Sequence, residues 1–282
     1  GSQLASSNNS VLITGTGSVW TNSGDLYVGK AGNGNSLAIA DGGTVVADGI
    51  GIIGDGIPAS NNTVLVAGTN SLWTNSGNLY VGYFGRSNSL VISNRGTVAV
   101  GTNSYIGFGS NSFSNSVLVT GAASGWTSGS NLIVGYEGSD NSLVISDGGT
   151  VANNDGTIGQ TSFASGNTVL VTGMNSLWTN LGNLYVGDAG SSNGLVISNG
   201  GTVAVATNGY IGYFNISSNN SVLVTGTNSL WTNSGALQVG SQGSGNSMVI
   251  ANGGKVLNTD GNIGFASSAS SNSVLVTGAN SL

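Results

Sequence analysis

The chain has 282 residues, of which 50 are Gly and one is Pro, and charged residues make up only 5% of it. Its four basic residues, Lys30, Arg86, Arg95 and Lys255, are too few to neutralise a phosphate backbone or to attach the chain to an anionic membrane, so we expect neither partner. There is no Cys, which excludes disulfides, and no apolar run approaches the ~20 residues of a membrane helix, so we expect no membrane insertion.

Internal repeats organise the whole chain. Trp residues recur at intervals of 52 or 53 residues, and each interval contains two copies of a shorter unit of 26 or 27 residues. A unit opens with Ser or Thr, once Gly, followed by three aliphatic residues. These openings stand at Ser10, Ser36, Thr63, Ser89, Ser116, Ser142, Thr168, Gly194, Ser221, Ser247 and Ser273. The sequence therefore holds ten full copies, with a partial copy at each end.

Each unit predicts three short strands. In the unit that opens at Thr63 they cover residues 64–66, 71–74 and 79–81, and Gly, Asn and Ser between them suit turns with positive φ. No segment has the 3.6-residue hydrophobic period of a helix. Three strands and three turns in about 26 residues predict an all-β fold, a parallel β-helix (β-solenoid) of about ten coils. We assign residues 1–282 to one such domain, roughly 50 Å tall at ~4.8 Å per coil.

The first strand of each unit carries three consecutive aliphatic residues. Because strand side chains alternate between faces, the middle residue should point outward if its two neighbours point inward. The middle residues are Leu12, Ala38, Leu65, Val91, Leu118, Val144, Leu170, Val196, Leu223, Val249 and Leu275. Such an outward apolar stripe is uncommon on a monomer and predicts a lateral contact surface. The alternative is that the stripe is tolerated for its β-propensity or covered by an adjacent turn.

The second strand contains the tryptophans, Trp20, Trp73, Trp126, Trp178 and Trp231. At the same offset, ten positions into the unit, the other units have Val46, Ala99, Ala152, Ala204 and Leu257. We therefore expect a structural ladder in which large and smaller side chains alternate along the stack.

The turn before the third strand repeats a side chain that can accept hydrogen bonds. Asp48, Asn103, Asp155, Asn208 and Asp260 form this column, and we expect it in every second coil, with neighbours ~10 Å apart. Asn side chains at fixed turn positions can also bond one another along the axis of a stack.

The third strand carries tyrosines. Tyr27, Tyr80, Tyr105, Tyr185 and Tyr210 occupy its middle position, where the other units have Ile52, Ile133, Thr157, Gln238 and Asn262. A column of tyrosines on a flat sheet face is a candidate surface for stacking against sugar rings. Cross-strand packing that needs no ligand is the alternative.

No residue pattern predicts catalysis. The chain has no His, and its ten acidic residues do not pair at the ~5–9.5 Å that a glycoside hydrolase needs. Asp41 and Asp147 are equivalent but four coils apart, ~19 Å, and Glu137 with Asp140 is best interpreted as a solvated turn. We therefore expect no enzyme activity, no metal and no cofactor.

Two phrases, NLYVGYFGRSNSLVISNRGTVAV and NLYVGDAGSSNGLVISNGGTVAV, carry a resemblance to a known bacterial repeat. Their shared elements are Leu-x-Val-Gly, a Gly/Ser/Asn turn, Leu-Val-Ile-Ser and Gly-(Gly)-Thr-Val, and they recur from Gly1 to Leu282. The chain resembles the repeat of type V secretion (autotransporter) passengers and PEP-CTERM surface proteins. That resemblance implies a right-handed parallel β-helix, export to the cell surface or beyond, and a structural, adhesive or matrix role. It implies no catalytic residues.

These observations predict a mechanical function. We expect a stiff rod, used as a stalk, adhesin shaft or filament, located outside the cell or on a bacterial surface. Its expected partners are further copies, by lateral or end-to-end contact, or surface glycans. Because both ends of the sequence fall inside a repeat, we also expect a window of a longer array without caps. The alternatives are a carbohydrate-binding module that uses the tyrosine column and a polysaccharide-degrading β-helix enzyme.

Overall fold

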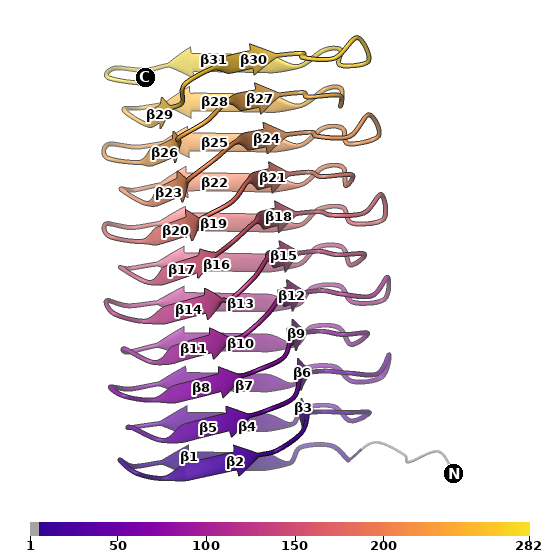
Figure 1. The fold of residues 1–282 in the computed structure, drawn as a ribbon, viewed down its shortest axis with the longest axis vertical. Helices are drawn as coiled ribbons and strands as arrows, with labels where there is room; N and C mark the ends of the chain where they lie inside the picture. The colour runs from indigo at the N-terminus through magenta and orange to yellow at the C-terminus, as the bar shows by residue number, and fades with distance from the viewer. Residues whose placement is uncertain (1–5) are drawn as a thin grey trace.

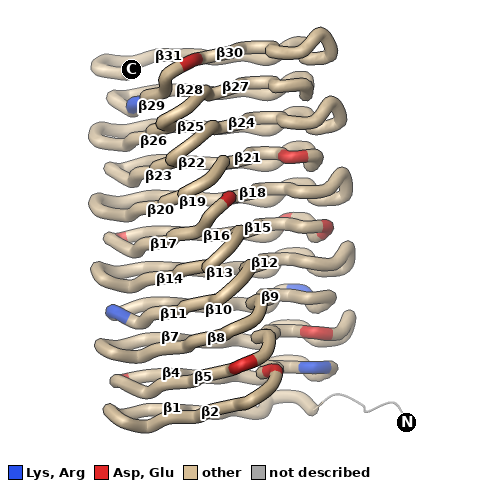
Figure 2. Tube along the Cα trace, viewed as in Figure 1, with Lys and Arg blue, Asp and Glu red and all other residues tan. Residues whose placement is uncertain are grey.

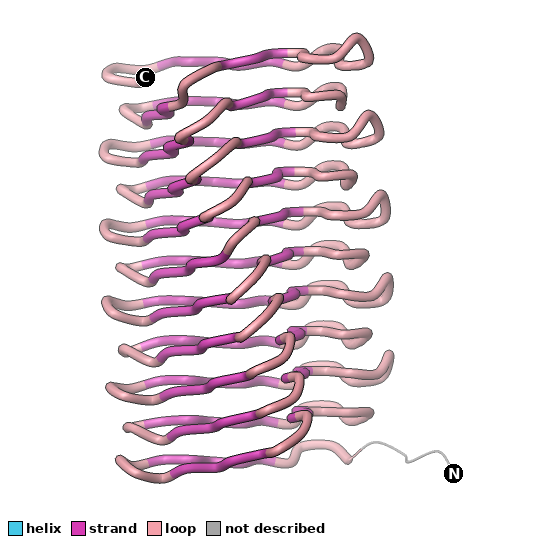
Figure 3. Tube along the Cα trace, in the orientation of Figure 1, coloured by secondary structure: helices cyan, strands magenta, loops and turns pink. Residues whose placement is uncertain are grey.

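The computed structural model describes residues 6–282 and shows a stack of similar coils (Figure 1). Every full coil consists of three strands and three turns, and the described residues contain no helix (Figure 3). Strands of successive coils pair in parallel, which gives one eleven-stranded and two ten-stranded sheets. The predicted fold class, an all-β parallel β-solenoid with about ten coils of about 26 residues, is confirmed.

Sheet A holds the first strand of each coil. Its members are β1 (Ser10–Thr14), β4 (Ser36–Ala40), β7 (Thr63–Ala67), β10 (Ser89–Ser93), β13 (Ser116–Thr120), β16 (Ser142–Ser146), β19 (Thr168–Thr172), β22 (Gly194–Ser198), β25 (Ser221–Thr225), β28 (Ser247–Ala251) and β31 (Ser273–Thr277).

Sheet B holds the second strand of each coil. Its members are β2 (Val19–Asn22), β5 (Thr44–Ala47), β8 (Leu72–Asn75), β11 (Thr97–Val100), β14 (Gly125–Ser128), β17 (Thr150–Asn153), β20 (Leu177–Asn180), β23 (Thr202–Val205), β26 (Leu230–Asn233) and β29 (Lys255–Leu257).

Sheet C holds the third strand. Its members are β3 (Leu26–Val28), β6 (Gly51–Ile53), β9 (Leu79–Val81), β12 (Ser104–Ile106), β15 (Leu132–Val134), β18 (Gly156–Ile158), β21 (Leu184–Val186), β24 (Gly209–Ile211), β27 (Leu237–Val239) and β30 (Gly261–Ile263). Turn 1 joins sheet A to sheet B, turn 2 joins B to C, and turn 3 leads from C to the next coil.

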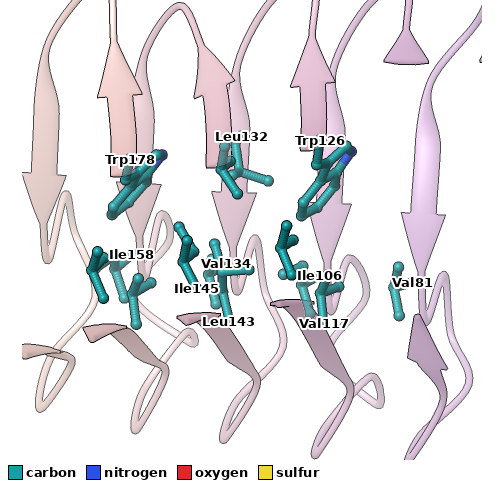
Figure 4. Packing of buried hydrophobic residues seen from close by; sticks show 14 of the residues in the cluster. Val81, Ile106, Val117, Trp126, Leu132, Val134, Leu143, Ile145, Ile158 and Trp178 are labelled. Carbon is teal, nitrogen blue, oxygen red and sulfur yellow. The ribbon is translucent and has the colours of Figure 1, made fainter. Parts of the chain in front are cut away.

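The tryptophans lie inside the stack and alternate with valines. Trp126 pairs with Val98 below it and Val151 above it, and all three side chains are at most 2% exposed. Figure 4 shows Trp126 and Trp178 pointing into the core above a layer of aliphatic side chains. Trp20, in the first described coil, is half-buried. A Trp in every second layer fills the core without two indoles competing for one space.

The predicted partners of the tryptophans were wrong by one residue. Val46, Ala99, Ala152, Ala204 and Leu257 pair with the Thr that follows each Trp, so they lie on the outer face of sheet B. Turn 1 has four residues in a Trp coil, such as 68–71, and three in the next coil, such as 94–96. Counting from the start of each unit therefore loses the register at this turn.

A ladder of Asn side chains runs through the whole described stack, immediately before the sheet A strands. From Asn35 onward, each Oδ1 accepts hydrogen bonds from both the backbone N–H and the Nδ2 of the Asn one coil below, and the Nδ2–Oδ1 distances are 2.8–3.2 Å. We call these residues the Asn ladder. They are Asn9, Asn35, Asn62, Asn88, Asn115, Asn141, Asn167, Asn193, Asn220, Asn246 and Asn272.

The Asn ladder explains the glycine that follows each sheet C strand. Gly159 has φ +76°, and a Cβ there would lie 2.1 Å from Nδ2 of Asn193. Only a residue without a side chain leaves room for the ladder at this place, and Gly also adopts positive φ without strain.

The turn 2 column also differs from the prediction. Asn131 and Asn183 stand in the coils between Asn103, Asp155 and Asn208, so the column continues through successive coils rather than every second one. In each case a side-chain oxygen accepts a backbone N–H from the next coil, at 2.6–3.2 Å. Asp48 does not belong to it, because Ile50 occupies the equivalent place above Asp25.

Candidate functional site

Apart from Lys255, the charged residues lie at the turns (Figure 2). All ten acidic residues are in turns, distributed over the three edges of the stack, and Lys255 alone of the basic residues lies within a strand. Among residues 6–282 no three acidic side chains come close enough to hold a metal ion. The same residues include no helix that is long and apolar enough to cross a membrane.

The structure places the predicted apolar stripe on the outer face of sheet A. The two flanking aliphatic residues of each interior strand are buried, and the middle residue is not. Leu65 is 39% exposed, Leu118, Leu170 and Leu223 are half-buried, and Leu12 and Leu275 lie on the two end strands of the sheet. No charged residue occupies an outward position of sheet A, where Ser, Thr, Ala and Gly flank the stripe.

The predicted tyrosine column forms two stacked pairs instead of one continuous ladder. Tyr80 and Tyr105 stack with their ring centroids 5.0 Å apart and their planes at 6°. Tyr185 and Tyr210 stack at 5.1 Å and 11°. The fifth, Tyr27, is separate from both pairs, and the ammonium of Lys30 lies 4.5 Å from its ring centroid.

A second aromatic column, which the sequence interpretation missed, runs beside the tyrosines. It is formed by the second residue of turn 3, immediately after the glycine that follows each sheet C strand, and it contains Tyr83, Phe108 and Tyr136 in successive coils. Their rings stack at 4.9 and 4.8 Å and meet the tyrosine column edge to face. The signal in the sequence is the residue that follows Leu-x-Val-Gly or Tyr-Ile-Gly.

Aromatic side chains other than Trp are confined to one side of the molecule. All eight Tyr and all six Phe lie on sheet C or in turn 3. We define the first aromatic cluster as Tyr80, Tyr83, Phe84, Tyr105, Phe108 and Tyr136, and the second as Tyr185, Tyr210, Tyr213 and Phe214. The two clusters are separated by one coil, in which Thr157 and Gln160 occupy the corresponding positions.

The ring geometry limits what each cluster can bind. Offset-stacked and edge-to-face contacts at these distances are the favoured arrangements of aromatic rings and add about 0.5–1.5 kcal/mol per pair. Within a stack, however, each ring covers the face of the next. A flat ligand therefore finds a free ring face only where a column is interrupted, as it is above Tyr210, which pairs with Gln238.

Tyr185 of the second aromatic cluster and the nearby Asp188 have strongly raised pKa values. Burial raises the pKa of the Tyr185 hydroxyl to about 12, so this tyrosine stays neutral at physiological pH. Burial also raises the pKa of Asp188 to about 6. Asp188 follows Gly187 in turn 3, in the same column as Tyr213.

The Asp188 shift predicts a pH dependence of stability. Because the folded protein binds this proton more tightly than the unfolded chain, the contribution of Asp188 to the free energy of unfolding should be largest below pH ~4 and be lost as the pH rises through about 6. Asp188→Asn should therefore be more stable than the wild type at pH 7 and equally stable at pH 3.5, as measured by thermal unfolding. Asp140→Asn, an exposed turn 3 position, controls for the loss of one charge. An Asp188→Asn effect of the same size at both pH values would contradict the assignment.

Hollows at the two ends of the described stack are lined by core residues, such as Trp20 and Leu26 at one end and Ile250 and Val274 at the other.

Comparisons with protein-family models, curated proteins and solved structures found no match. The fold alone defines the class of the chain, which is a β-solenoid repeat protein.

Proposed function

We propose that the chain is a structural protein, a stiff segment of a β-solenoid rod that serves as a stalk, adhesin shaft or filament. The observation that carries the proposal is the unbroken Asn ladder, which joins every described coil to the next by the same pair of hydrogen bonds. Coils of nearly constant length and without an inserted loop support a function that resides in the shape. The dispersed acidic residues support the further proposal that the chain is not an enzyme.

We further propose that copies contact one another laterally through the outer face of sheet A. Five residues across and ten strand spacings along give a face of about 800 Å², the area that each partner contributes to a standard protein interface. Since no charged residue lies in a strand of sheet A, the net charge of −6 is not carried on either of the two contacting faces.

Lysines in the stripe should abolish this contact. We expect Leu118→Lys, Leu170→Lys and Leu223→Lys together to shift sedimentation at high protein concentration from dimers or larger species to monomers, because each buries a charge in the interface. The control places three lysines on the outer face of sheet B in the neighbouring strands, at Thr127, Thr179 and Thr232. Lateral pairing would be contradicted if the wild type stays monomeric, or if the sheet A and the sheet B lysine substitutions change the sedimentation to the same extent.

The location that fits this role is the outside of a bacterial cell. A low charge content, the absence of Cys and the resemblance to surface-protein repeats support export. Antibodies raised against the folded chain should label intact cells or extracellular filaments under electron microscopy. Labelling that appears only after the cells are permeabilised would contradict an extracellular location.

A second candidate function is carbohydrate binding, favoured by one observation. Phe and Tyr are restricted to sheet C and turn 3, although sheets A and B offer equally regular outer faces. Packing alone does not require this restriction to one side. Aromatic side chains gathered on one face together with polar side chains are the composition of a surface that recognises ligands.

A further inference from the structure

The second aromatic column contains a gap one ring wide. At the second residue of turn 3, three successive coils have Tyr213, Ser241 and Phe265. The backbone N–H groups of these residues donate to Gly187, Gly212 and Gly240 of the preceding coils, so the three stand in register one above another. Where rings occupy this position in consecutive coils, one ring fills one coil spacing of 4.8–4.9 Å. Ser241 therefore leaves the space of one ring unfilled between Tyr213 and Phe265.

That space is open to solvent as a hollow of about 310 Å³. Tyr210 and Tyr213 line it from the coil below, Phe265 from the coil above, and Gln238, Ser241 and Gln242 from the coil between. Phe265 and Tyr213 are two coil spacings apart, ~10 Å, so the hollow admits one flat ring with a ring on either side. Its volume is at the lower end of the range for small-molecule sites.

The polar residues of the hollow are unused by the protein. Among residues 6–282 the side chains of Gln238, Ser241 and Gln242 have no hydrogen-bond partner, although Ser241 is only 5% exposed. Two amides and a hydroxyl supply both donors and acceptors and carry no charge. They match a ligand that is flat on its two faces and rich in hydroxyl groups around its edge.

We propose that this gap, the Ser241 slot, binds one ring of a neutral sugar. A pyranose offers C–H faces to the flanking aromatic rings and hydroxyls to Gln238, Ser241 and Gln242. No basic side chain lines the slot, and Asp188 stands in the same column one coil below Tyr213, which disfavours anionic sugars. An aromatic side chain from a protein partner fits less well, because it would cover the three polar groups while offering them at most one hydrogen-bonding group.

The slot goes beyond the proposed mechanical function, which needs no ligand, and it rests on the second candidate function, carbohydrate binding, for which it names one site and one class of sugar. It also differs from binding along the whole tyrosine column, because the ring faces within the stacked pairs are covered. Both Tyr210 and Tyr213 lose a stacking neighbour at the same coil, so free ring faces and unpaired polar groups occur together at this place.

The test measures binding of soluble neutral tetrasaccharides built from glucose, mannose, galactose, xylose or N-acetylglucosamine, by isothermal titration calorimetry. The wild type should bind at least one of them. Ser241→Phe supplies the missing ring and should abolish binding. The control is Gln160→Phe, which adds a ring to the same column next to Tyr136, three coils away from Ser241, and should leave binding unchanged. Circular dichroism reports whether each variant keeps its β-structure.

A second variant protects the test against misfolding of Ser241→Phe. Gln238→Ala with Gln242→Ala removes two hydrogen-bonding groups without filling the slot and should weaken binding at least tenfold. The proposal is overturned if the wild type binds none of the tetrasaccharides, or if either the folded Ser241→Phe variant or the double variant binds as tightly as the wild type. Loss of binding with unchanged thermal unfolding separates the slot from the structural role of the coils.

Discussion

Replacing Asn167 by Ala should lower the free energy of unfolding by about 3–5 kcal/mol. The Oδ1 of Asn167 accepts the backbone N–H and the Nδ2 of Asn141, at 3.0 and 3.1 Å, and its own Nδ2 donates to Gly138 and Asn193. All these groups are buried, and each donor left without a partner costs about 1–3 kcal/mol. The loss should be measured by chemical denaturation of the whole chain.

The control for Asn167→Ala is a solvent-exposed Asn outside the ladder. Asn111, at the tip of a turn 3, has no side-chain hydrogen bond among the described residues, so Asn111→Ala should change stability by no more than about 0.5 kcal/mol. If the two variants unfold at the same denaturant concentration, the Asn ladder does not contribute to stability as proposed.

Replacing Trp126 by Ala should cost about 3–5 kcal/mol, the usual range for removing a large aromatic side chain from a packed core. Trp126 is 1% exposed, and its Nε1 has no hydrogen-bond partner among the described residues, so the variant loses packing alone. Trp178 would be a less direct choice, because its Nε1 donates to Asn153 at 2.7 Å. Denaturation again measures the effect.

The neighbouring Thr127 supplies the matched control for Trp126→Ala. It lies on the outer face of the same strand, so Thr127→Ala should have a small effect. A Trp126→Ala variant as stable as Thr127→Ala would show that the alternation of Trp and Val does not hold the coils together.

The sequence was sufficient to predict the repeat, the three strands per coil and the faces of the sheet A residues. These features follow from the period of the sequence and from alternation along a strand, which no tertiary contact overrides here. The partners of the tryptophans were predicted wrongly, because the length of turn 1 differs by one residue between alternate coils. The composition of the turn does not reveal this difference in length. Val98 and Ala99 are both plausible neighbours of Trp126 until the pairing is known.

The candidate site was only partly predictable, for a different reason. The tyrosines of sheet C stand out by alternation, but Tyr83, Phe108 and Tyr136 lie in a turn, where no periodicity marks the direction of a side chain. Their stacking depends on the coil spacing and on the backbone bonds that align turn 3 between coils. The Ser241 slot is still less visible in the sequence, because it is defined by a missing ring between two that are 52 residues apart.

Mechanical unfolding of single molecules tests the central claim most directly, namely that the coils are the units of a stack whose function is its stiffness. If each coil is held mainly by its neighbours, pulling on the two ends should release the chain in steps that are multiples of about 90 Å, the extended length of one 26- or 27-residue coil. Release of the whole chain in a single step, or in steps unrelated to the coil length, would contradict this account.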